Sequence, residues 1–90
     1  MAVLRSVRTS ASQETYDRVV GSMKLHSEHP LGLILHGATL VDGEIQVTQV
    51  WDSAEYAVRY EDEVLAPALA AHGVTVREVR LIELSDLVTP

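Results

Sequence analysis

Three side chains with the chemistry to bind or transform a small molecule occur at matched positions in two neighbouring stretches of the sequence. His36 stands in the apolar run at residues 31–40, and Gln49 and Trp51 end the run that follows Asp42-Gly43. An imidazole exchanges protons near neutral pH, an amide orients a ligand, and an indole forms an apolar wall. On one face of a sheet, they would line a pocket for acid–base chemistry on an apolar or aromatic molecule.

The Asp42-Gly43 pair predicts which residues of the two stretches face each other. Both residue types tolerate the positive φ angles of a two-residue type I′ turn. Counting outward from the turn, His36 faces Gln49. Two residues further, Ile34 faces Trp51. The sequence leaves two environments open for this face. It is either a ligand pocket, in which His36 is the catalytic acid or base, or a core beneath helices, in which His36 is bonded to Gln49 or a tyrosine hydroxyl.

Tyrosines in the helical stretches are further candidates. Tyr56 and Tyr60 are four residues apart, so one helix face presents both hydroxyls to a pocket mouth as substrate-binding groups. The alternative is that they frame the helix edge or a subunit seam. Tyr16 lies in the apolar stripe of an earlier helix, where we expect core packing and a partner for its hydroxyl.

Other polar residues favour structural or solvent-exposed roles. His26 and His29 flank a loop position, and no third ligand is apparent, so we expect exposed histidines and no metal site. The acidic run at residues 61–63 is expected to be a solvated helix face. The bases expected to form weak ion pairs with acids across strands are Arg5, Arg77 and Arg80.

The elements that must position these residues follow the order β-α-β-β-α-β. Apolar patterns predict four strands, at about residues 2–8, 33–40, 44–51 and 74–84. Helical periodicity predicts two helices, at about residues 10–25 and 53–72. Ser10 or Ser12 caps the first helix, Ser53 caps the second, and Pro67 kinks or restarts it. This order predicts an α+β fold of the ferredoxin-like type, a four-stranded antiparallel sheet with both helices on one face.

One face of such a sheet has no cover within the chain. The stretch at residues 33–40 is apolar on both sides, which is typical of a strand buried on both faces. We therefore expect a homodimer in which a second copy covers the open sheet face. The chain has 90 residues and is expected to form a single domain over residues 1–90, small enough to gain stability from association.

The composition disfavours several classes of function. Net charge is −6, so neither nucleic acid nor an anionic membrane is expected as a partner. There is no cysteine, hence no disulfide and no thiolate metal site. No apolar run approaches the roughly 20 residues that span a bilayer. Arg5 interrupts the N-terminus too early for a signal peptide, and we expect a soluble, cytoplasmic protein.

Three segments form a familiar combination, namely His29-Pro30-x-Gly32-Leu33-Ile34-Leu35-His36, Trp51-Asp52-Ser53 and Leu65-Ala66-Pro67-Ala68-Leu69. Together with the order of elements, they resemble the dimeric α/β-barrel superfamily over nearly the whole chain. The nearest group is its small members similar to antibiotic biosynthesis monooxygenases. The resemblance implies a dimeric α/β barrel with a site between the sheet and the helices of each protomer. It also implies that Trp51 lines the pocket and that His36 occupies a strand position that can point inward.

The superfamily includes cofactor-free oxygenases of aromatic polyketides, polyketide cyclases, lactone isomerases, haem-degrading enzymes and proteins of no known activity. The haem-degrading members share an Asn-Trp-His constellation, and oxygenases of the superfamily tend to place an asparagine in the pocket. This sequence contains no asparagine, which disfavours haem and leaves Gln49 as the substitute amide.

The resemblance and the residues together imply a cofactor-independent enzyme or binding protein. It would act on a small apolar or aromatic molecule, as a monooxygenase, a cyclase or an isomerase does. The alternative is a non-catalytic dimeric module of the same fold, which binds a ligand or is purely structural. Whether the protein is an enzyme stays open at the level of the sequence.

Overall fold

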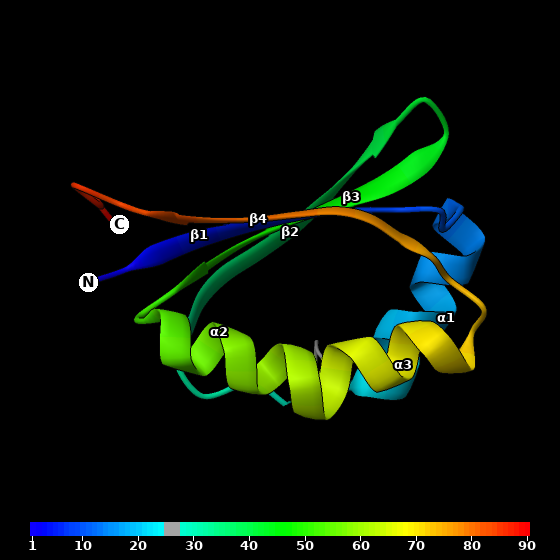
Figure 1. Cartoon of the computed structure of the whole chain (residues 1–90), viewed down its shortest axis with the longest axis horizontal. Coiled ribbons are helices and arrows are strands. Elements are labelled where there is room, and N and C mark those ends of the chain that lie inside the picture. The colour runs from blue at the N-terminus through cyan, green and yellow to red at the C-terminus, as the bar shows by residue number, and fades with distance from the viewer. Residues whose placement is uncertain (25–27) are drawn as a thin grey trace.

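The computed structural model describes residues 1–24 and 28–90, which form a four-stranded sheet with helices on one face (Figure 1). The strands are β1 (Val3–Thr9), β2 (Leu33–Val41), β3 (Glu44–Trp51) and β4 (Val76–Glu83). The helical elements are α1 (Gln13–Met23), α2 (Ala54–Tyr60), the π-helical segment η1 (Glu61–Leu65) and α3 (Ala66–Ala71). Since α2, η1 and α3 follow one another without a break, the order β-α-β-β-α-β and the ferredoxin-like fold are confirmed.

The strand order is β2-β3-β1-β4, and every neighbouring pair is antiparallel. Asp42 and Gly43 have φ angles of 52° and 79°, the two positive values that a type I′ turn requires. The predicted pairing of His36 with Gln49 is therefore confirmed. The predicted pairing of Ile34 with Trp51 is wrong. A register shift between residues 33 and 35, as a β-bulge produces, leaves Ile34 unpaired and aligns residue 33 with Trp51.

Strand β2 is exposed along most of its length within the single chain. One of its faces is the side that a second copy is expected to cover, but the expected burial of the helix-facing side is wrong, because the helices leave it open at Leu40. It forms one edge of the sheet, and Leu33 is its one buried residue. Leu35 and Leu40 lie on opposite faces of the strand, and their exposed fractions are 47% and 51%. The helices pack on β3 in preference to this edge, which explains why the helix-facing side of β2 also remains open.

Helix α1 begins after Ser12, whose hydroxyl accepts a hydrogen bond from the Thr15 N–H at 3.2 Å. The competing cap, Ser10, accepts instead from the Thr75 N–H at 2.9 Å, which ties the start of α1 to the segment before β4. The predicted helix end at residue 25 lies outside the described residues. Ser53 occupies the N-cap position of α2, although its side chain makes no capping hydrogen bond within the described part of the chain.

Pro67 lies at the start of α3, directly after the π-helical segment, so the predicted restart is confirmed. The Ala66 N–H bonds to the Glu61 carbonyl, which closes a turn one residue wider than an α-helical turn. Proline has no N–H to continue an α-helical ladder, and a widened turn accommodates that loss. The side chain of Glu61 meets Arg5 of the sheet, so the expectation that it belongs to a solvated face is wrong. The next two acids are exposed.

Buried apolar residues form three clusters between the sheet and the helices. The first contains Val3, Val20, Leu33, Trp51 and Ala57. The second contains Val7, Ala11, Ile45 and Val47. The third joins α1 to η1 and α3 and contains Val19, Leu65 and Leu69. Within the described chain, no helix has both the length and the apolar composition to cross a membrane.

Gly32 provides a test of how β2 approaches α2. Its φ angle is +83°, and a Cβ atom built on it would lie 2.5 Å from the Tyr56 ring. An alanine in the left-handed conformation costs roughly 1–2 kcal/mol. We expect Gly32→Ala to lower the free energy of unfolding by more than this, because its Cβ atom would also clash with the Tyr56 ring. Gly21→Ala is the control, because a Cβ there meets nothing within 4 Å. The free energy of unfolding of Gly21→Ala, measured by urea denaturation, should rise by about 0.5–1 kcal/mol. Equal effects in both variants would contradict the close packing of Gly32 against Tyr56.

Candidate functional site

One row of side chains across the helix-facing side of the sheet is polar, although the rows on either side are apolar. The register aligns His36 of β2 with Gln49 of β3, and Gln49 with Arg5 of β1. We call these three residues the polar row. Arg5 and Gln49 are only 4% and 1% exposed. The neighbouring rows belong to the first and second apolar clusters, so the polar row separates the two.

A chain of hydrogen bonds runs through part of the polar row. The Trp51 Nε1–H donates to Gln49 Oε1 over 3.1 Å. Gln49 Nε2 lies 3.2 Å from His36 Nδ1, and His36 Nε2 lies 2.6 Å from the Tyr16 hydroxyl oxygen. The structure thus brings together three residues singled out in the sequence and adds Tyr16 of α1. The expectation that Tyr16 needs a partner for its hydroxyl is confirmed.

The indole fixes the direction of this chain. Because an indole N–H can only donate, the oxygen of the Gln49 amide faces Trp51 and its NH₂ group faces His36. Nδ1 of His36 therefore accepts, and the neutral ring carries its proton on Nε2, which donates to the Tyr16 oxygen. From Trp51 to Tyr16, each group donates a hydrogen bond to the next. The hydroxyl hydrogen of Tyr16 is not used in this series of hydrogen bonds.

Tyr60 approaches the same region from α2. Its ring centroid lies 5.2 Å from that of Trp51, and its hydroxyl is buried with no hydrogen-bond partner among the described residues. Burial, and then the nearby Tyr16, raise the pKa of Tyr60. Burial, and then Asp17, raise the pKa of Tyr16. Both phenols therefore remain protonated at neutral pH and can act as donors.

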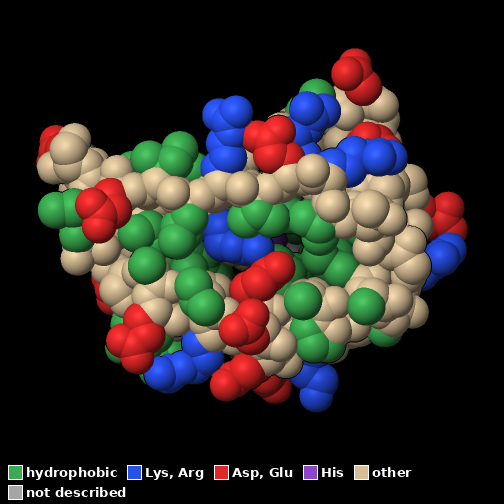
Figure 2. All heavy atoms as spheres, viewed as in Figure 1, with side chains coloured by type: hydrophobic (Ala, Val, Ile, Leu, Met, Phe, Trp, Pro, Cys, Tyr) green, Lys and Arg blue, Asp and Glu red, His purple; other side chains and the backbone are tan. Residues whose placement is uncertain are grey.

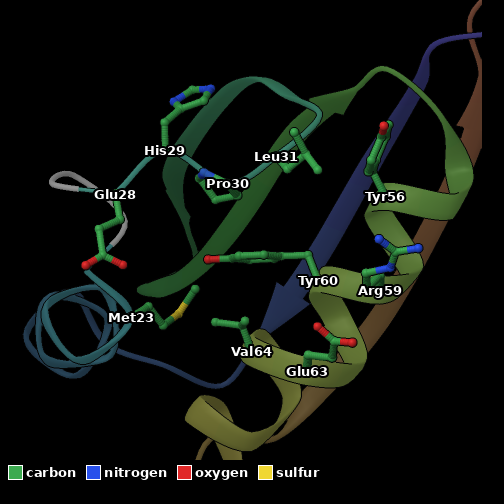
Figure 3. Close-up of a pocket in the computed structure, with 10 residues that line it drawn as sticks. All are labelled: Met23, Glu28, His29, Pro30, Leu31, Tyr56, Arg59, Tyr60, Glu63 and Val64. Atoms are coloured by element: carbon green, nitrogen blue, oxygen red, sulfur yellow. The ribbon is translucent and has the colours of Figure 1, made fainter.

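Two cavities lie beside these residues. The outer pocket has a volume of about 290 Å³ and lies between the end of α1, residues 28–31 and the helical run from α2 to η1. In Figure 3, Tyr60 points across this pocket from α2 toward the side of Met23, and Tyr56 stands further along the same helix. The inner cavity, of about 20 Å³, has about the volume of a single water molecule and is lined by Thr9, Tyr16 and His36 together with apolar residues.

The predicted site residues are divided between these two cavities. His36 lines the inner cavity, whereas Tyr56 and Tyr60 line the outer pocket. Gln49 and Trp51 line neither, and Trp51 is 0% exposed beneath the helices. Met23 lines both cavities and therefore forms part of the wall between them.

The expectation that Arg5 forms an ion pair with an acid across strands is wrong, because its partner lies in the helical layer. Arg5 Nη2 lies 2.5 Å from Glu61 Oε2 of η1, and the two side chains are 5% and 24% exposed. Burial lowers the pKa of Arg5, and the Glu61 carboxylate offsets part of that effect. The sequence does contain a signal for this pair. Arg5 alternates with Val3 and Val7 on the buried face of a strand, and an acid interrupts the apolar stripe of a helix.

The remaining polar candidates have structural partners. Arg77 pairs with Glu44 of β3 at 2.7 Å, as expected of an ion pair between strands. The expectation of a cross-strand partner for Arg80 is wrong, because Arg80 pairs with Glu78 of its own strand, two residues away on the same face. The exposed His29 places Nε2 2.6 Å from a backbone carbonyl oxygen, that of residue 33. His26 lies outside the described residues, and no group of three or more possible ligands in the described ranges could hold a metal ion.

Comparison with known proteins supports the fold. No family profile matches the sequence, and no curated protein sequence is recognisably similar to it. Among solved structures, SnoaB from Streptomyces nogalater, described as a cofactor-independent oxygenase, has a TM-score of 0.71 at 14% identity, covering 99% of this chain and 98% of that one. A candidate antibiotic biosynthesis monooxygenase from Deinococcus radiodurans has a TM-score of 0.69 at 16% identity, covering 100% and 98%.

The chain therefore has the fold of the antibiotic biosynthesis monooxygenases, as the resemblance predicts. The de novo designed protein Foldit4 also matches, with a TM-score of 0.63 at 17% identity, covering 93% of this chain and 99% of that one. Since a designed protein shares the architecture, the fold by itself carries no activity.

The direction of the hydrogen-bond chain can be tested at Gln49. Gln49→Glu keeps an acceptor for Trp51 but presents a second oxygen to His36, which must then place a proton on Nδ1. We expect nitrogen-15 NMR of the imidazole to show the Nε2–H tautomer in the native protein and an Nδ1-protonated ring in the variant. Gln46→Glu, on the opposite face of β3, should leave the ring unchanged. An Nδ1–H tautomer in the native protein would contradict the assigned direction.

Proposed function

We propose that this protein binds a small apolar or aromatic molecule beneath its helices and acts on it by acid–base chemistry that needs no cofactor. The observation that carries the proposal is the directed series of hydrogen bonds from Trp51 to Tyr16, whose last two residues, His36 and Tyr16, line the inner cavity. The likeness in fold to SnoaB, described as a cofactor-independent oxygenase, is compatible with it.

In this proposal, Tyr16 contacts the ligand and His36 acts through it. The Tyr16 hydroxyl donates to an oxygen of the ligand, and the Nε2–H of His36 donates a hydrogen bond to the Tyr16 oxygen, which stabilises the phenolate that forms if the Tyr16 proton moves to the ligand. Donors aligned in a dry site stabilise charge that develops on the ligand oxygen. The arrangement suits a phenol or an enolisable carbonyl compound. Gln49 holds the histidine tautomer, and Trp51 holds the amide.

The apolar body of such a ligand needs more space than the inner cavity offers. The outer pocket provides about 290 Å³ beside Tyr56 and Tyr60. Met23 lies in the wall shared by both cavities, and its unbranched thioether side chain changes rotamer readily. We therefore place the ligand body in the outer pocket, with its oxygen reaching Tyr16 past Met23.

The proposal can be tested with 2-naphthol and naphthalene as paired probes, because naphthalene lacks the oxygen that would accept from Tyr16. Tyr16→Phe removes one hydroxyl and should weaken the binding of 2-naphthol by about threefold to tenfold, the effect of one neutral hydrogen bond. Binding of naphthalene should change less. Tyr56→Phe, in the outer pocket, is the control and should not alter the preference. Fluorescence titration measures both affinities, and equal weakening of both probes by Tyr16→Phe would refute the proposed contact.

The full burial of Trp51 and the small inner cavity favour a second candidate for the function, in which the hydrogen-bonded residues from Trp51 to Tyr16 have a purely structural role. We expect His36→Ala to lower the free energy of unfolding by about 1–3 kcal/mol in either case, because it leaves buried polar groups of Tyr16 and Gln49 unpaired. Under the proposed function, the variant also loses its preference for 2-naphthol. A destabilised variant that binds both probes as the native protein does would establish the structural role.

We also propose that the protein is a homodimer that uses one end of the open sheet face. On this face the register aligns Leu35, Val50, Leu4 and Ile82 in an apolar row. Leu35 and Ile82 are 47% and 49% exposed. The next rows on this face are mostly polar, so the apolar row is the part of the face that association would cover.

Leu35→Glu tests this interface. A buried, unpaired carboxylate opposes association, so we expect the native protein to sediment as a dimer at micromolar concentration and the variant as a monomer. Leu40→Glu is the matched control, because Leu40 lies in the same strand with a similar exposure of 51% but on the opposite face. A monomeric native protein, or equal effects of the two substitutions, would rule the interface out.

A further inference from the structure

A groove between β4 and the helical layer has a buried charge at its base. Its volume is about 190 Å³, and it is lined by Arg5, Ala57, Val58, Glu61, Val79 and Leu81. Figure 2 shows basic and acidic side chains in a hollow that apolar side chains of the sheet edge and the helices surround. The groove lies on the β4 side of the polar row, opposite the edge that carries His36.

The guanidinium of Arg5 has more donors than its partner uses. It carries five N–H groups in a planar fork. Arg5 is 4% exposed, and in the described part of the chain its ion pair is with a single oxygen of Glu61. Burial lowers the pKa of Arg5 by more than Glu61 raises it, so the pair leaves the buried cation incompletely compensated.

The walls of the groove are apolar side chains that remain open to solvent. Val58, Val79 and Leu81 are 51%, 47% and 44% exposed, although all three border the same groove. Apolar walls that converge on one charged group are the usual composition of a small-molecule site. The two features are independent, since the burial of Arg5 does not require its neighbours to be exposed.

We infer that this groove binds a small monocarboxylate with an apolar body, whose carboxylate pairs with the guanidinium of Arg5. Arginine and carboxylate groups match each other in bidentate geometry, and the apolar walls take the body of the ligand. The volume of about 190 Å³ lies below the roughly 300–1,000 Å³ of sites for drug-sized ligands, so the ligand is small, like benzoate.

A single negative charge fits this site better than a dianion such as phosphate. Arg5 provides one positive charge, and Glu61 already neutralises part of it. Glu61 therefore competes with the ligand for the same cation. If the groove binds a carboxylate, neutralising Glu61 should therefore strengthen ligand binding. A purely structural ion pair predicts no such increase in affinity. The inference uses neither Tyr16 nor His36 and does not depend on the acid–base function proposed above.

The test compares benzoate with benzyl alcohol, a neutral molecule of similar size, by isothermal titration calorimetry on the full chain. We expect benzoate to bind at least about tenfold more tightly than benzyl alcohol, as an additional charged contact predicts. Glu61→Gln should increase the affinity for benzoate by about fivefold to tenfold and leave benzyl alcohol little changed. Arg5→Met should abolish the preference for benzoate.

Because Arg5→Met removes a buried charge and can impair folding, Val58 provides a second variant at the exposed rim. Val58→Glu should repel the carboxylate and weaken benzoate binding, whereas the size-matched Val58→Gln should not. Amide chemical-shift changes caused by benzoate should centre on Val79 and Leu81. Equal affinity for the two probes, weaker benzoate binding in Glu61→Gln, or shifts centred on the outer pocket would each overturn the inference.

Discussion

The hydrogen bond from the Trp51 indole to the Gln49 amide sets the polar organisation of this protein. Trp51 is fully buried, and an unpaired indole N–H there would cost about 1–3 kcal/mol. Gln49 meets this need because residues two apart on a strand share a face. Once the amide oxygen is committed to the indole, its NH₂ group faces His36, which determines the histidine tautomer and the direction of the contact with Tyr16.

The polar row has an energetic cost in so small a core. It separates two apolar clusters that would otherwise join, and it requires partners from the helices at both of its ends. Tyr16 of α1 satisfies the end at β2, and Glu61 of η1 satisfies the end near β4. Both of these partners come from helices, so the row couples the sheet to the helical layer. The proposed function rests on this row because its hydrogen-bonded residues lie beside a cavity.

The π-helical segment links the backbone of the second helical run to the polar row. Pro67 prevents a regular α-helical ladder through this region, and the wider turn of η1 absorbs the defect. Glu61 opens that turn and forms the ion pair with Arg5. Wide turns of this kind frequently occur at functional sites. Here the first residue of the turn supplies the carboxylate that lines the groove together with the buried cation.

The sequence by itself determined the order of elements, the hairpin at Asp42-Gly43 and the pairing of His36 with Gln49, because turn chemistry and strand alternation are set by neighbouring residues. The tertiary structure decided the bulge at Ile34, the exposure of the helix-facing side of β2 and the contact of Tyr16 with His36. That contact joins segments far apart in the sequence, so it depends on how the helices lie on the sheet, which no local pattern specifies. The pairing of Arg5 with Glu61 stands between these cases. Each charge breaks an apolar pattern visible in the sequence, but only the packed helical layer shows that the two interruptions meet.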